Sequence, residues 1–233
     1  IYEASASAMF GVPIEEITKG SPLRQKGKVA ELACGYGGSV GALKAMGALE
    51  MGLHEDDLQP LIQQWRSANP NIVRYWWDCD AAAMKVVREK LPVRVGRVCF
   101  HCHSGFLFIT LPSGRNLAYA KPRFALNQFG REGLTYEGVG ESRKWMRIDT
   151  YGPKLVENIV QATARDLLAE AMLRLRDAGY EIVMHCHDEV VIEAPCGQGS
   201  VEDVGRIMAM IPDWADGLPL NADGYECKFY KKE

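Results

Sequence analysis

The sequence has no apolar run as long as the roughly 18 residues that a membrane span needs. It also has no basic and apolar first segment of the kind that directs secretion. Its seven cysteines are scattered rather than arranged in the regular framework of a small secreted domain. These absences argue against a membrane protein and a disulfide scaffold. We therefore expect a cytoplasmic protein with no membrane partner.

A large charge of one sign is missing as well, since 27 Lys and Arg stand against 30 Asp and Glu. A formal charge of −3 excludes a general basic coat for nucleic acid. Basic residues nevertheless cluster in two short segments: Lys19, Arg24, Lys26 and Lys28, then Arg143, Lys144, Arg147 and Lys154. Local positive patches on a nearly neutral body suit a protein that grips phosphates in a cleft.

The first half of the chain is predicted to be helical, with no internal repeat, low-complexity tract or flexible linker. Residues 22–50 carry good helix formers, interrupted by glycines at 35, 37 and 38. Residues 55–67 begin in an acidic turn, which suits a helix N-terminus. Asn69-Pro70 is typical of a cap followed by proline at the first helical position, and predicts a helix to about Lys90.

After Pro92 the pattern changes to strands. A period of two over 93–103 predicts one strand, and 106–110 and 116–120 predict two more. Apolar residues at helical spacing then predict a long helix that ends at Gly179. Residues 180–194 read as two strands that fold back around His187-Asp188, and a short helix follows near 201–211. The predicted fold class is α+β: a helical block followed by an antiparallel sheet backed by a long helix.

The first candidate site is a stripe on the helix expected over 22–50. Arg24, Lys28, Leu32 and Tyr36 are spaced four apart and so wind slowly along one face. Two cations could neutralise a triphosphate, and the ring could sit under a base or sugar. A solvated basic face with a buried tyrosine fits the same spacing equally well.

The second candidate is His187-Asp188-Glu189. Acidic residues at hairpin turns are common, and a purely structural role fits them. A carboxylate pair between two apolar strands could also bind Mg²⁺, which takes one or two carboxylates together with substrate phosphates. Two such ions can stabilise the attacking and leaving oxygens of a phosphoryl transfer.

A third group could suggest zinc. The predicted strands hold seven possible ligands: Cys99, His101, Cys102, His103, His185, Cys186 and His187. Their spacing matches no common zinc motif, and strand alternation would divide each group over both faces of a sheet. A zinc-dependent hydrolase is therefore the weaker alternative.

In this order the motifs resemble family A DNA polymerases, the family of bacterial DNA polymerase I. The segment from Arg24 to Gly37 is similar to motif B on the fingers helix, and His187-Asp188-Glu189 to motif C. Residues 1–11 resemble the stretch between motifs A and B, and 152–163 the palm helix that meets the primer-template minor groove. Residues 111–115 and 157–162 are closest to the phage and prophage branch.

The resemblance implies a role for each residue of the nucleotide site. Arg24 and Lys28 would hold the incoming deoxynucleoside triphosphate, and Lys28 would also protonate the pyrophosphate leaving group. Tyr36 and the adjoining Gly37 would lie at the base-pair end of the helix. Tyr2 occupies a position where the family often has a histidine that touches the triphosphate. Leu32 stands where the family usually has Phe or Tyr, beside the sugar.

The resemblance also implies how DNA and metal are bound. Gln161, His187 and Arg147 would contact the primer-template DNA, the first two near the primer terminus. Asp188 would bind the two catalytic Mg²⁺ ions, with Glu189 as a weaker partner. Glu157 stands where the family often has Asn.

The implied organisation is a fingers region over 1–91 and a C-terminal palm over 92–233. The family needs a second metal-binding Asp, in motif A, and a thumb; we expect both on an upstream segment that acts as a partner. A non-catalytic nucleic-acid-binding remnant, or half of a split polymerase, is the main alternative. A phage-type RNA polymerase segment is disfavoured, because that branch typically has Ser at the position of Glu189.

Overall fold

A computed structural model describes residues 1–126, 130–140 and 142–230, and its mixed helices and antiparallel sheets confirm the α+β fold class. The helices are α1 (Tyr2–Phe10), α2 (Pro22–Gly35), α3 (Val40–Ala45), α4 (Glu55–Ala68), α5 (Pro70–Glu89), α6 (Gly152–Asp177) and α7 (Val201–Met208), with short 3₁₀ turns η1 (Ile14–Glu16) and η2 (Asp213–Ala215). The strands are β1 (Val93–Val95), β2 (Val98–His103), β3 (Phe106–Thr110), β4 (Asn116–Leu126), β5 (Glu132–Val139), β6 (Trp145–Thr150), β7 (Glu181–Cys186) and β8 (Glu189–Glu193).

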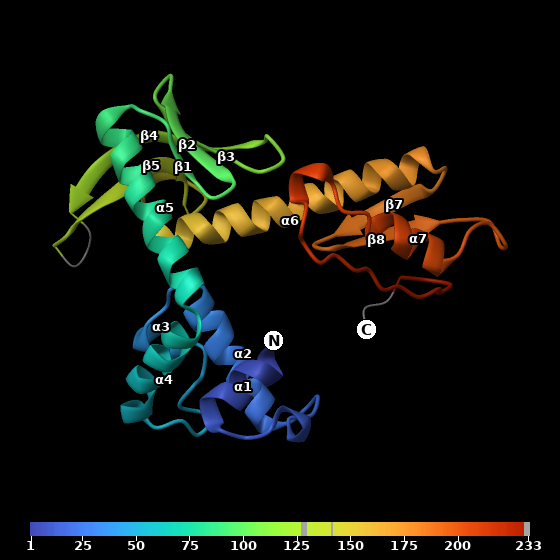
Figure 1. Ribbon diagram of the computed structural model, residues 1–233, viewed down its shortest axis with the longest axis horizontal. Helices are drawn as coiled ribbons and strands as arrows, with labels where there is room; N and C mark the ends of the chain where they lie inside the picture. Colours follow the sequence, from blue (N-terminus) through green and yellow to red (C-terminus); the bar gives the residue numbers. More distant parts are fainter. Residues whose placement is uncertain (127–129, 141, 231–233) are drawn as a thin grey trace.

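Helices α1 to α4 form one block, drawn in blue to teal in Figure 1, and α5 runs from it to the sheet. Helix α2 begins where expected for local reasons. The Ser21 hydroxyl accepts a hydrogen bond from the Leu23 amide at 3.2 Å, and Pro22 occupies the first helical turn, where its missing N–H costs nothing. Asn69 behaves differently: its side chain donates to the Trp65 carbonyl at 2.9 Å instead of capping α5.

Strands β1 to β6 form an antiparallel sheet in which every strand pairs with its neighbours in sequence. The single strand expected over 93–103 is wrong, because the chain turns at Gly96-Arg97 and Val95 pairs with Val98. Gly96 has a φ of 55°, the left-handed conformation that such a tight turn requires. The strands expected at 106–110 and 116–120 are confirmed, and β4 continues to Leu126. Strands β5 and β6 were not predicted.

One face of the six-stranded sheet belongs to the core. Val98, Phe100, Leu107 and Ile109 are buried in the same cluster as residues of α5. The first turns of α6 enter this cluster through Leu155, Val156 and Ile159. The expected long helix therefore backs the sheet with its N-terminal part only, and α5 supplies the rest of the cover.

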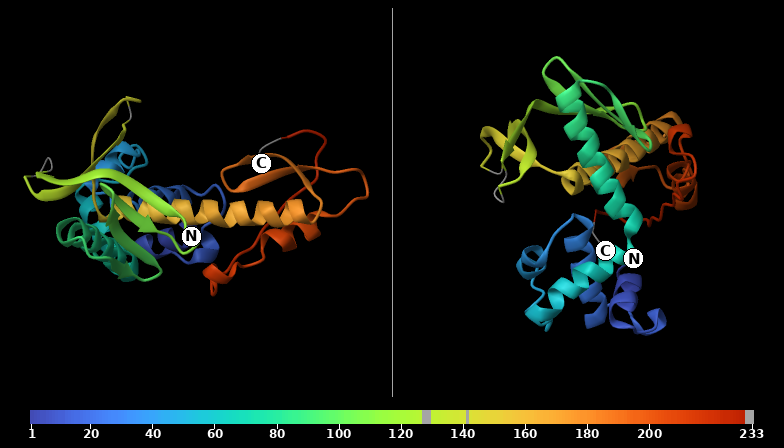
Figure 2. Two further views of the ribbon diagram at one scale, coloured as in Figure 1. Left: turned by 90° about the horizontal axis from the view of Figure 1, so that it is seen from above. Right: turned by 60° about the vertical axis from the view of Figure 1, so that its left-hand side comes forward.

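The remainder of α6 extends away from the sheet to a third part of the molecule, made of the β7–β8 hairpin and α7 (Figures 1 and 2). The two strands expected around His187-Asp188 are confirmed, with Cys186 paired to Glu189 across the turn. Helix α7 is capped by the Ser200 hydroxyl, which accepts from the Asp203 amide at 3.1 Å. No helix in the described ranges is long and apolar enough to cross a bilayer.

Candidate functional site

The close approach of α1 and α2 depends on Gly27, in the middle of α2. A Cβ at this position would lie 2.3 Å from the Tyr2 carbonyl oxygen and 2.9 Å from the Ala6 Cβ. Neither distance is tolerated between real atoms, so only glycine lets the two helices pack this closely. The contact places the first turn of α1 beside the first two turns of α2.

Tyr2, Arg24 and Lys28 consequently form a cluster, which we call the basic cluster. The Arg24 guanidinium lies 5.3 Å from the centroid of the Tyr2 ring, and the Lys28 ammonium 5.9 Å from it. Arg24 also forms an ion pair with Glu3, one residue along α1. The hydrogen bond from Arg24 lowers the pKa of Glu3 below its usual range. The family resemblance had already grouped Tyr2, Arg24 and Lys28. Glu3 carried no signal in the sequence, because only the packing of α1 on α2 brings it into the cluster.

Glu31 fixes the same helices from the buried side. Its Oε2 accepts a hydrogen bond of 2.6 Å from the Ser5 hydroxyl and one of 2.7 Å from the Trp65 indole. One carboxylate thus joins α1, α2 and α4. Because the indole and hydroxyl are fixed by their own helices, the basic cluster rests on a rigid support.

The other predicted members of the stripe lie further along α2. Leu32 is half-buried, while Tyr36 follows the last turn and is 44 % exposed. The alternative of a buried tyrosine is therefore wrong. Gly37 has a φ of 73°, and a Cβ there would come within 2.4 Å of Pro153 at the start of α6. The C-terminal end of the stripe thus packs against the first turn of α6.

The β7–β8 turn presents the predicted metal ligands. His187 has a φ of 51°, an uncommon conformation for a non-glycine residue, and such strained positions are frequent at functional sites. His187 and Asp188 are both exposed. The Glu189 carboxylate accepts a hydrogen bond of 2.5 Å from the Tyr230 hydroxyl, which raises the pKa of that phenol to about 12. Tyr230 carried no signal in the sequence.

The carboxylates of Asp188 and Glu189 are suitable ligands for Mg²⁺, which prefers oxygen donors and often takes only one or two from protein. Among the described residues no three His, Cys, Asp or Glu side chains gather closely enough to hold a metal ion. The turn thus presents two neighbouring carboxylates and no larger ligand group among the described residues. In the sheet, pairing of Cys99 with Thr110 and of Cys102 with Leu107 places these two cysteines on opposite faces.

Gln161 lies in a shallow groove of about 450 Å³ between α6 and the sheet. Its amide donates to Glu157 at 3.2 Å, and Glu157 accepts from Lys154 at 2.8 Å. At the floor of the groove the Asn158 amide donates to the Tyr119 hydroxyl at 2.9 Å. Burial raises the pKa of Tyr119 to about 12. Gln161 itself is exposed and open to a ligand.

Arg147, the third predicted DNA contact, is held in the sheet. Its guanidinium donates to the Thr135 hydroxyl at 3.1 Å and to Glu137 at 3.0 Å. Thr135 and Glu137 flank Tyr136 in β5, and Tyr136 lines the groove of Gln161. Because side chains alternate along a strand, Glu137 and its pairing partner Arg147 lie on the other face of the sheet. Gln161, His187 and Arg147 thus come from three separate places. Within the described ranges no hydrogen bond, ion pair or ring contact joins the basic cluster to the β7–β8 turn.

The chain is similar to a phage DNA polymerase. It is 58 % identical over 235 aligned residues to the DNA polymerase of Bacillus phage SP02, and the match includes the whole of this chain. The chain spans 36 % of the length of that polymerase. No model of a known protein family matches the sequence.

Because the match covers the whole chain, it includes the basic cluster, the groove of Gln161 and the β7–β8 turn. These three sites lie in separate parts of the fold, as Figure 1 shows for the helices and strands that carry them. A similarity confined to one of them would say little about the others. The extent of the match instead relates all three to the same phage polymerase.

Proposed function

We propose that this chain is the fingers and C-terminal palm of a family A DNA polymerase. The complete enzyme would add deoxynucleoside monophosphates to a primer 3′ end on a DNA template. The observation that carries this proposal is the basic cluster on α1 and α2 in a chain 58 % identical to a phage DNA polymerase. That similarity also favours the DNA enzyme over a phage-type RNA polymerase.

The basic cluster would bind the triphosphate of the incoming nucleotide. Arg24 offers a planar fork that matches phosphate oxygens, and Lys28 adds a compact charge one turn further along α2. The ion pair with Glu3 occupies Arg24 before the nucleotide arrives. Triphosphate binding then exchanges one anionic partner for another. Lys28 would give its proton to the pyrophosphate that leaves, and the exposed Tyr36 would lie near the base pair.

Asp188 and Glu189 would hold Mg²⁺ at the β7–β8 turn. When bound, magnesium would neutralise the charge that develops on the reacting phosphate. Asp188 is exposed and has no partner among the described residues, so it is open to a ligand, whereas Glu189 is half-buried and engaged by Tyr230. This difference supports Asp188 as the principal ligand. A second carboxylate, and the thumb, would come from a segment outside these 233 residues.

Gln161 and His187 would bind the primer-template DNA, because both are exposed and present hydrogen-bonding groups. Acceptors common to all base pairs lie in the minor groove, so such contacts need no sequence preference. Arg147 would have to leave Glu137 to reach a phosphate, and its contribution would be smaller. A division into fingers over 1–91 and palm over 92–233 is part of the proposal, and falls between α5 and β1.

Nucleotide binding tests the basic cluster directly. A deoxynucleoside triphosphate with Mg²⁺ is titrated into the chain and into its Lys28→Ala variant. Loss of one charge-assisted contact, worth about 1.5–3 kcal/mol, predicts an affinity at least about tenfold lower. Glu3→Gln should raise the affinity, because it releases Arg24. Lys26→Ala is the matched control: Lys26 lies on the same helix but over Phe10, and its loss should change little. Equal losses for the two lysines would contradict the proposed site.

A further inference from the structure

The face of the six-stranded sheet that is turned away from α5 carries an unusual set of side chains. Register places His101 beside Phe108 and Ala118, and His103 beside Phe106 and Ala120. Arg94 lies on the same face, in the row of Cys99. We call this surface, formed by Arg94, His101, His103, Phe106, Phe108, Ala118 and Ala120, the aromatic face.

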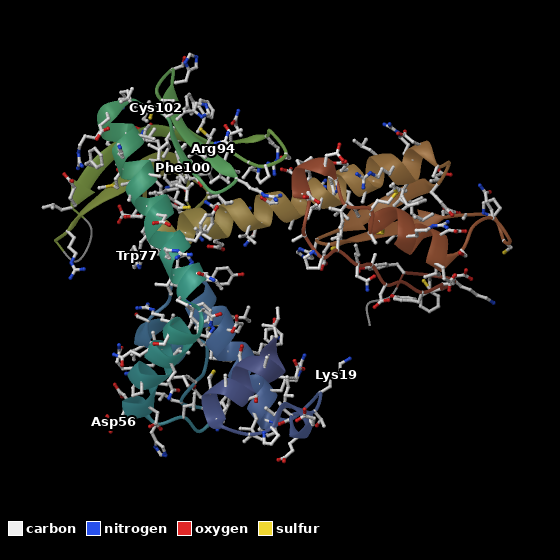
Figure 3. The ribbon with its side chains drawn as sticks, viewed as in Figure 1. Lys19, Asp56, Trp77, Arg94, Phe100 and Cys102 are labelled. Atoms are coloured by element: carbon white, nitrogen blue, oxygen red, sulfur yellow. The ribbon has the colours of Figure 1, made fainter. Side chains whose placement is uncertain are left out.

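Alternation along the strands explains why the aromatic face is open. Phe100 and Leu107 point into the core and are fully buried, whereas Phe106 is 38 % exposed and Phe108 half-buried. Figure 3 labels Arg94 and Phe100, which come from paired strands; Arg94 pairs with Cys99, the residue before Phe100, and so points to the opposite face. The sheet thus has one covered face and one with exposed aromatic rings.

The rings of the aromatic face form a continuous stack. The centroids of His101 and Phe108 are 5.3 Å apart with planes inclined by 24°, and those of Phe106 and Phe108 are 5.7 Å apart with planes inclined by 23°. Strand β4 carries only Ala118 and Ala120 beside them. Small neighbours leave the ring surfaces free, so a planar group can extend the stack. A nucleobase is such a group.

The segment of the chain that forms the six-stranded sheet is basic, which favours a polyanion as the ligand of the aromatic face. Residues 92–150 contain nine Lys and Arg against four Asp and Glu, in a chain whose formal charge is −3. Arg94 is exposed and makes no hydrogen bond or ion pair with a described residue. Aliphatic side chains, which a protein partner would bury, are absent from the described outer side of β2 and β3, where Cys99 and Thr110 complete the rows. Stacked rings beside a cation are the combination with which proteins bind single-stranded nucleic acid.

We propose that the aromatic face binds an unpaired DNA strand, with bases stacked on Phe106, Phe108 and His101 and the backbone neutralised by Arg94. Successive rows of the face are about 7 Å apart along a strand, so it holds two or three bases. The choice of DNA as the occupant rests on the proposed function, whereas the surface rests on the sheet alone. A polymerase that meets unpaired template could hold it here, away from the basic cluster.

Fluorescence anisotropy of a labelled oligothymidylate of about 16 nucleotides tests this proposal, without nucleotide or Mg²⁺. Each stacked base lost should weaken binding by about tenfold, so we expect that loss for Phe106→Ala and for Phe108→Ala. Phe106→Tyr should retain binding, since it keeps the ring. Trp77→Ala is the control, because Trp77 is 55 % exposed on α5. Thermal unfolding of each variant shows that the fold is intact.

Three outcomes would overturn the proposal: equal losses for Phe106→Ala and Trp77→Ala, equal affinity for a duplex, or no binding at about 50 mM salt. The last would leave the face as a surface for a protein. An RNA oligomer bound more tightly than DNA would overturn the choice of DNA. The oligomer and the triphosphate are titrated separately, so the two proposals can fail independently. If the oligomer binds through the rings but no triphosphate binds, the proposed nucleotide site is refuted and the aromatic face is supported.

Discussion

Replacement of Gly27 by alanine tests whether the contact between α1 and α2 assembles the basic cluster. The added Cβ would lie 2.3 Å from the Tyr2 carbonyl oxygen, so α1 must move by about 1 Å to restore an ordinary contact. Gly35 is the matched control. It lies on the same helix, its φ is not positive, and a Cβ there would meet no atom within 4 Å.

The two substitutions should change stability in opposite directions. Overpacking costs about 1–3 kcal/mol, and the better helix propensity of alanine returns up to about 1 kcal/mol. Gly27→Ala should therefore destabilise the chain by up to about 3 kcal/mol net. For a chain of this length, about 2–4 °C of Tm corresponds to each kcal/mol, so the midpoint should fall by up to about 12 °C. Gly35→Ala gains the better helix propensity of alanine without overpacking, so it should raise Tm by about 1–4 °C.

Thermal unfolding, monitored by circular dichroism, measures whether each substitution raises or lowers Tm. Titration with a triphosphate measures how each substitution changes the nucleotide affinity of the basic cluster. Displacement of Tyr2 should weaken nucleotide binding in Gly27→Ala and leave Gly35→Ala unchanged. Equal midpoints for the two variants, or a more stable Gly27→Ala, would refute the role of Gly27 in bringing the helices together.

Two further predictions concern the sheet. Tyr119→Phe removes the hydroxyl that accepts from Asn158 and should cost about 1 kcal/mol in urea unfolding; an unchanged midpoint would contradict the anchoring of α6 to β4. Hydrogen bonds from Lys121 and Trp145 lower the pKa of Glu137 to about 2. A depressed pKa adds stability that is complete above the usual value of about 4.3 and is lost as the pH falls toward 2. The difference in Tm between the wild type and Glu137→Gln should therefore shrink from pH 5 to pH 2, and a constant difference would argue against this linkage.

Local patterns explain what the sequence could predict. Helix α2 carries its start signal in Ser21-Pro22, and α6 has apolar residues at helical spacing over its whole length. The β7–β8 hairpin follows from two apolar runs around a two-residue turn. Each of these signals lies within a few residues of the structure that it specifies, so no knowledge of distant contacts was needed.

The elements that were missed depend on distant partners. Strands β5 and β6 intersperse Glu, Gly, Arg and Asp among their apolar residues, and they are stabilised by pairing with β4 and by the Glu137 network. The Gly96-Arg97 turn shifts the alternation by one residue, so that Val95 shares the core face with Val98 rather than with Cys99. A single period of two drawn through 93–103 therefore misses the turn. The ion pair of Glu3 with Arg24 likewise exists only because α1 returns to α2.

Primer extension with Mg²⁺ and all four deoxynucleotides is the measurement that tests the central claim most directly. The chain is assayed alone and mixed with a polypeptide that supplies the thumb and the second metal-binding carboxylate. We predict synthesis in the mixture only, abolished by Asp188→Asn and retained in Asp223→Asn, an exposed carboxylate outside the site. Synthesis by the chain alone, or by the Asp188→Asn mixture at the wild-type rate, would contradict the account. A folded and associated mixture that makes no DNA would instead support a non-catalytic nucleic-acid-binding protein.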